Sequence, residues 1–110
     1  MGYRLIFLSA VAFMSFTQAA SAGTAGSGLV TNTVSFPAGQ FLFYQNGARN
    51  SAPSCALQGR WAIYVSTPGG QAAQANVLTA FAMGRPITVT GTGTCSVDGL
   101  AETVLYLEVN

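Results

Sequence analysis

Apolar and polar residues alternate along several short segments of the chain, with the period of two that is typical of half-buried β-strands. In residues 29–36, Val30, Val34 and Phe36 fall on one face, and threonine and serine fall on the other. The pattern predicts five strands, at residues 29–36, 40–45, 60–66, 86–92 and 102–109.

The same alternation assigns the side chains of a strand to an inner and an outer face. In the third predicted strand, Trp61 and Ile63 share the inner face, whereas Tyr64 points the other way. In the last strand, Tyr106 is expected on the outer face. Its inner face is expected to consist of Leu105, Leu107 and Val109.

Between the third and fourth strands the pattern changes to that of a helix. Residues 71–83 are rich in alanine and repeat apolar side chains at helical spacing. Thr67 can cap the N-terminus, Pro68 suits the first helical position, and Gly84 suits the left-handed position after the last turn. Because two glycines weaken the first turn, the regular helix is expected to start near Gly70.

The order of elements is therefore β-β-β-α-β-β, mostly β with one helix. This order is that of a five-stranded Greek-key barrel of the OB type, in which the helix plugs one end. An open α+β sheet with one helix across a face also fits. We expect one domain over residues 29–110, with a surface loop at residues 48–54 and a flexible lead-in of small residues at 23–28.

The first 22 residues have the composition of a secretory signal peptide. Arg4 precedes an apolar run at residues 5–16, which is shorter than the roughly 20 residues needed to span a bilayer. The small residues Ala20-Ser21-Ala22 then form an A-x-A cleavage site. We therefore predict a protein secreted to the periplasm or beyond it, with Gly23 as its first residue and no membrane span after cleavage.

Charge is sparse in the part that would remain. Removal of Arg4 leaves three arginines against three carboxylates, and the chain contains neither lysine nor histidine. Nucleic acids and anionic membranes are bound through clustered basic residues, so neither is expected as a partner. The lack of histidine also argues against a Ser-His or Cys-His catalytic pair and against the common metal sites. We expect no catalytic residue, metal or cofactor.

Two cysteines, Cys55 and Cys95, would enter an oxidising compartment. A structural disulfide between them would close a loop of about 40 residues. A reactive thiol pair or a metal site is less favoured, because there is no C-x-x-C spacing and no histidine.

Two further groups of side chains are candidates for chemistry or binding. Asp98 and Glu102 lie four residues apart and could form the carboxylate pair of a glycosidase. Asp98 stands in a predicted turn and Glu102 opens a strand, so solvated surface charges are the favoured interpretation. Tyrosines on outer faces can stack on sugars or fill a partner interface, and Trp61 is expected in the core. The candidate ligand-binding residues are Tyr64, Tyr106 and Tyr44.

Residues 55–106 resemble a group of small secreted bacterial proteins without an assigned function. The resemblance is carried by Cys55 with Arg60-Trp61-Ala62, by Gly91-Thr-Gly-Thr-Cys95-Ser96 and by Glu102-Thr103. More distantly, the helix-to-strand unit LTAFAMGRPITVT resembles the B subunits of pertussis-like and subtilase-type AB5 toxins. That second resemblance implies a secreted OB-fold protein that binds host glycans as a ring of five.

The first functional hypothesis is a secreted, non-enzymatic binding module, assembled as a homo-oligomer such as a pentamer, that recognises a host glycan or surface protein. The second is a monomeric periplasmic or extracellular structural or inhibitor-like protein. The third is a small hydrolase that uses Asp98 and Glu102.

Overall fold

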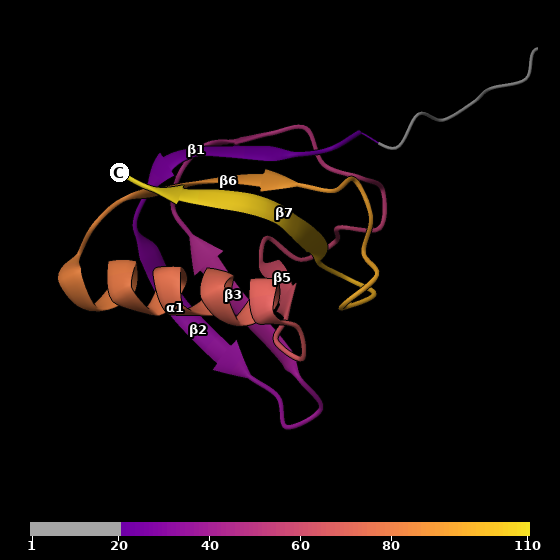
Figure 1. The fold of residues 1–110 in the computed structure, drawn as a ribbon. Coiled ribbons are helices and arrows are strands. Elements are labelled where there is room, and N and C mark those ends of the chain that lie inside the picture. Colours follow the sequence, from indigo (N-terminus) through magenta and orange to yellow (C-terminus); the bar gives the residue numbers. More distant parts are fainter. Residues whose placement is uncertain (1–20) are drawn as a thin grey trace, which may run out of the picture.

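The computed structural model describes residues 21–110 and shows a mostly β fold with one helix (Figure 1). Most of the predicted signal peptide, residues 1–20, lies outside the described part. The elements are β1 (Thr24–Gly28), β2 (Val30–Ser35), β3 (Gln40–Gln45), β4 (Arg49–Asn50), β5 (Trp61–Tyr64), α1 (Pro68–Met83), β6 (Ile87–Gly91) and β7 (Glu102–Val109).

The seven strands belong to one sheet with the order β2-β3-β5-β7-β6-β1-β4. Neighbouring strands are antiparallel except β5 and β7, which run parallel. The mostly β composition with a single helix is confirmed. The sheet is not closed, because β2 and β4 form separate edges, so the predicted barrel is not confirmed.

Two strands were not expected from the sequence. Strand β1 lies in the predicted flexible lead-in, where Ala25 is buried and pairs with Val89 of β6. Strand β4 lies in the predicted surface loop and pairs with β1. Small residues allow these backbones to approach closely, since a Cβ on Gly28 would collide with the backbone of Gly47. Such segments carry no alternating apolar pattern, so their sequence gives no strand signal.

Helix α1 has the termini that the sequence predicts. The hydroxyl oxygen of Thr67 accepts a hydrogen bond from the backbone N–H of Gly70 at 3.0 Å, and Pro68 is the first helical residue. At the other end Gly84 adopts the left-handed conformation, with φ of 63°. The helix begins two residues before the expected regular start, because this cap holds its first turn in place.

The core lies between the curved sheet and α1. The helix contributes Val77 and Ala80, and its exposed face is visible at the front of Figure 1. The strands contribute mainly large apolar side chains, which are Phe41, Phe43, Trp61, Ile63, Ile87 and Val89. Trp61 is therefore a core residue, as predicted. Burial of these side chains is the main favourable term in folding.

A β-bulge in β7 changes which of its side chains face the core. Tyr106 pairs with Thr90, but Val104 pairs with Gly91, so Leu105 is an extra residue between the two pairs. Val104 and Leu107 both pack against the core as a result, whereas Leu105 is 61% exposed. The prediction that Leu105 faces inward was wrong, because strict alternation does not continue through a bulge.

Three other predicted inner positions are also exposed. Val34 and Phe36 lie near the end of β2, where the β2–β3 hairpin extends past α1 (Figure 1). Val109 lies at the end of β7. No element of the described residues covers these three side chains, which alternation along the sequence does not reveal.

Candidate functional site

A cleft of about 220 Å³ lies between the N-terminal turn of α1 and strands β5 and β7. Its wall includes Ile63, Tyr64, Thr67, Gly70, Thr103 and Leu105. None of the described residues that line it carries a charge. The cleft is smaller than the roughly 300–1,000 Å³ of pockets for drug-sized ligands, so it suits one small neutral ring.

The ring of Tyr64 stands at the edge of this cleft. Tyr64 is the last residue of β5 and is 47% exposed. The turn before β3 supports its ring from behind, since a Cβ on Gly39 would lie 3.3 Å from Tyr64 Cε2. Gly39 has a φ of 98°, which favours glycine, and its carbonyl oxygen accepts a hydrogen bond from the N–H of Val65 at 2.8 Å. An aromatic face is thereby held beside the cleft.

The hydroxyl groups of Thr67 and Thr103 supply polar groups to the cleft. The first turn of the helix lies so close to β5 that a Cβ on Gly70 would collide with the carbonyl oxygen of Tyr64. Thr67 accepts the capping hydrogen bond and keeps its own hydroxyl hydrogen for donation. The hydroxyl of Thr103 lies 3.1 Å from that of Ser96. The arrangement can hold a neutral, hydroxyl-bearing ligand by stacking and hydrogen bonding.

The structure does not bring the three candidate tyrosines together. Tyr64 lines the cleft, but Tyr106 and Tyr44 are not among its lining residues. Tyr106 is 54% exposed on β7, and Tyr44 is half-buried in β3 opposite Asn32. Sequence reasoning treated Thr67 only as a helix cap and did not select Leu105, because no local pattern shows that a helix terminus and a bulge meet.

The carboxylates Asp98 and Glu102 are each paired with an arginine, and neither lines the cleft. Asp98 Oδ2 accepts hydrogen bonds from Arg60 Nη2 and Nε at 2.8 and 3.1 Å. This pair lies at the partly exposed loop end of the molecule, so it ties the loop before β7 to the start of β5.

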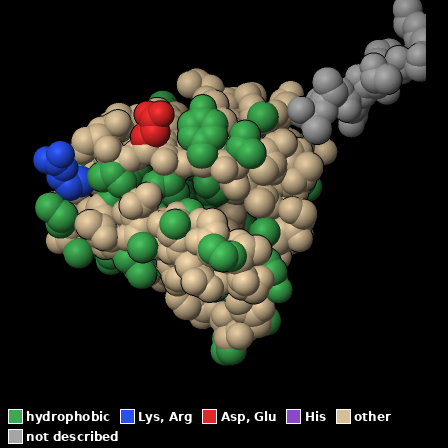
Figure 2. Space-filling model, in the orientation of Figure 1, with side chains coloured by type: hydrophobic (Ala, Val, Ile, Leu, Met, Phe, Trp, Pro, Cys, Tyr) green, Lys and Arg blue, Asp and Glu red, His purple; other side chains and the backbone are tan. Residues whose placement is uncertain are grey.

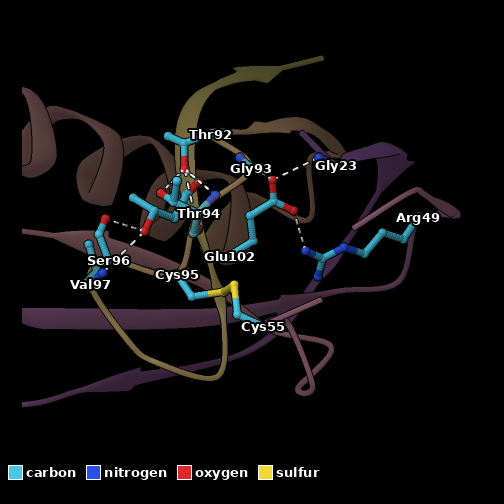
Figure 3. The surroundings of a disulfide bond; sticks show 11 residues. Gly23, Arg49, Cys55, Thr92, Gly93, Thr94, Cys95, Ser96, Val97 and Glu102 are labelled. Carbon is cyan, nitrogen blue, oxygen red and sulfur yellow. Dashed lines mark hydrogen bonds and ion pairs between the residues drawn. A yellow bond between two sulfur atoms is a disulfide. The ribbon is translucent and has the colours of Figure 1, made fainter. Parts of the chain in front are cut away.

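Glu102 is not a surface charge, contrary to the favoured interpretation, because its side chain is completely buried. Its Oε1 accepts a hydrogen bond from Arg49 Nη2 at 2.8 Å, and its Oε2 accepts from the N–H groups of Gly23 at 2.9 Å and Gly93 at 3.0 Å (Figure 3). Arg49 in turn stacks on Trp61, with Cζ 4.0 Å from the ring centroid. These partners compensate the buried carboxylate for its lost hydration. Glu102, Arg49, Gly23 and Gly93 are called the Glu102 cluster below.

The predicted disulfide is confirmed. Cys55 and Cys95 are bonded, with an S–S distance of 2.08 Å, beside the Glu102 cluster (Figure 3). The bond joins the loop after β4, the strand that carries Arg49, to the loop after β6, which carries Gly93. A disulfide fits an extracellular or periplasmic location.

No helix of the described residues has the length and apolar character needed to cross a membrane. The described residues also contain no group of three or more acidic, cysteine or histidine side chains placed to hold a metal ion. Comparison with protein-family models, with curated proteins and with solved structures finds no match to this chain.

Proposed function

We propose that the protein is a secreted, non-enzymatic binding module that holds a saccharide ring in the cleft beside Tyr64. The observation that carries the proposal is the exposed tyrosine ring fixed at the edge of an uncharged cleft. Sugar rings have apolar C–H faces that pack on aromatic rings, and their hydroxyls need donors and acceptors such as Thr67. The disulfide and the A-x-A site before Gly23 support the secreted location.

The test compares two tyrosines of similar exposure. The processed protein would first be screened on a glycan array, and the bound sugar would then be titrated by calorimetry. Tyr64→Ala is expected to weaken binding by about fivefold, since an aromatic contact contributes about 1 kcal/mol. Tyr106→Ala removes a similarly exposed ring outside the cleft and should leave Kd unchanged. Equal effects of the two substitutions, or no effect of Tyr64→Ala, contradict the proposal.

Within the mostly β class, we propose that the fold is an OB-like barrel in which β1 and β2 form one bent strand. Only Leu29 separates them, and its carbonyl oxygen accepts a hydrogen bond from Asn46 at 3.1 Å. If β1 and β2 count as one strand and the two-residue β4 is set aside, the order β2-β3-β5-β7-β6-β1 starts and ends on the same strand. The helix then lies between the third and fourth strands of the chain. This cycle supports the expected resemblance to toxin B subunits.

Self-association, as a ring of five or another homo-oligomer, is a second proposal. The exposed face of α1 carries Leu78, Phe81 and Met83, and the helix has no charged residue. On the side of the molecule that shows α1, charged groups lie toward one end and apolar groups are spread over the rest (Figure 2). Apolar exposure of this kind marks surfaces that bind a partner.

Light scattering behind a sizing column tests this second proposal. We expect a discrete oligomer that Leu78→Gln shifts toward monomer, whereas Thr79→Gln, at the adjacent exposed position, leaves the mass unchanged. A wild-type monomer at all concentrations contradicts self-association. That result would favour the alternative of a monomeric structural or inhibitor-like protein.

A further inference from the structure

We propose that the Glu102 carboxylate is the binding site for the α-ammonium group of Gly23 that cleavage after Ala22 creates. The backbone nitrogen of Gly23 already donates to Glu102 Oε2 over 2.9 Å (Figure 3). The carbonyl oxygen of the same residue accepts a hydrogen bond from Gly91 at 2.8 Å, so Gly23 is held on both sides. The inference rests on the predicted cleavage and is independent of saccharide binding.

Cleavage changes the chemistry of this contact. A signal peptidase hydrolyses the peptide bond between Ala22 and Gly23 with one water molecule. The C–N bond breaks, the carbonyl carbon of Ala22 takes the hydroxyl and leaves as a carboxylate, and the nitrogen of Gly23 takes protons to become an ammonium group. An α-amino group is mostly protonated at neutral pH. A neutral N–H donor thus becomes a charged one, and the hydrogen bond to Glu102 becomes an ion pair.

The surroundings of Gly23 fit such an N-terminus. Gly23 is buried, whereas Ser21 and Ala22 just before it are exposed. A side chain at position 23 has no room, since a Cβ would lie 2.5 Å from Glu102 Oε1 and 2.7 Å from the carbonyl oxygen of Ser51. Only glycine can bring the new terminus this close to the carboxylate. In the described part of the chain, cleavage removes an exposed 3.2 Å hydrogen bond from Ser51 to Ala22.

The charges of the cluster allow a second cation. Arg49 binds Oε1, and the peptide nitrogens of Gly23 and Gly93 bind Oε2, so the new ammonium group would not displace the arginine. The Arg49 side chain is 20% exposed and stacked on Trp61, so part of its charge is compensated outside the carboxylate. The buried carboxylate would then hold the first residue, β4 and the loop after β6 together.

The absence of lysine makes the test direct. All four basic residues of the chain are arginines, so the α-amino group is the only primary amine of the processed protein. The full chain would be expressed with its leader in a secreting bacterial host, and intact mass would establish whether the product starts at Gly23. The product would then react with an amine-reactive ester, either native or in denaturant. We expect native labelling to be slower by about tenfold or more, because a buried group reacts only after local opening.

An insertion provides the matched control. One serine placed between Ala22 and Gly23 leaves the fold and Glu102 unchanged but puts the amine one residue farther out, at an exposed position. This variant should label at the denatured rate while native. Processing at another bond, unprotected labelling of the wild type, or equal protection of the insertion variant would each overturn the proposal. Glu102→Gln, where it folds, should also label fast.

Discussion

At the scale of single residues, the carboxylate of Glu102 distinguishes this domain from a simple apolar core. Removal of its charge by Glu102→Gln leaves Arg49 without its partner, and breaking a buried ion pair costs about 3 kcal/mol. We therefore expect the midpoint of urea unfolding to fall sharply. Asp98→Asn is the matched control, since it removes a partly exposed pair and should cost about 1 kcal/mol or less. Equal losses in the two variants would show that the buried Glu102–Arg49 pair costs no more free energy of unfolding to break than the partly exposed pair.

This cluster could not be predicted from the sequence. Glu102 is 79 residues from Gly23 and 53 residues from Arg49, so no local spacing relates these groups. The sequence supports only the statement that a carboxylate opens the last strand. Its burial depends on two strands, β1 and β4, that have no alternating apolar signal. The outward position of Tyr64, in contrast, follows from the alternation of side chains in β5 alone, so its exposure could be predicted.

At the scale of elements, two adjacent glycines in the first turn of α1 are expected to respond to alanine in opposite directions. A Cβ on Gly69 meets nothing within 4 Å, so Gly69→Ala should stabilise the helix by about 0.5–1 kcal/mol. A Cβ on Gly70 collides with the backbone of Tyr64, so Gly70→Ala should destabilise the protein and disturb the cleft. Thermal unfolding of the two variants measures both effects. A stabilising Gly70→Ala would mean that the helix does not start against β5.

Elements with a local sequence signal could be predicted, whereas the register of pairing and the strands without an alternating pattern, β1 and β4, could not. The helix termini follow from Thr67, Pro68 and Gly84, each of which acts within one turn of its own position. The β7 bulge at Leu105 arises where Gly91 of β6 lies against the Glu102 carboxylate, and nothing near Leu105 indicates it. Strand existence was therefore easier to predict than the face of each side chain.

At the scale of the whole molecule, the disulfide joins the loop after β4 to the loop after β6, which the Arg60–Asp98 pair also links. Cys55 and Cys95 close a loop across 40 residues, and the chain-entropy relation gives about 4 kcal/mol for a loop of that length. A domain of this size has a total stability of about 5–15 kcal/mol. The bond is therefore a large share of what keeps the native state populated.

We accordingly expect reductant to lower the free energy of unfolding by about 4 kcal/mol, obtained from both the midpoint and the slope of urea unfolding. The double variant Cys55→Ser with Cys95→Ser should unfold at the midpoint of the reduced wild type and should not respond to reductant. The loop bound by Cys95 also presents Gly93 to Glu102, so loss of the bond should loosen this cluster as well. An unchanged midpoint would mean that the Glu102 cluster and the Arg60–Asp98 pair fix both loops without the bond.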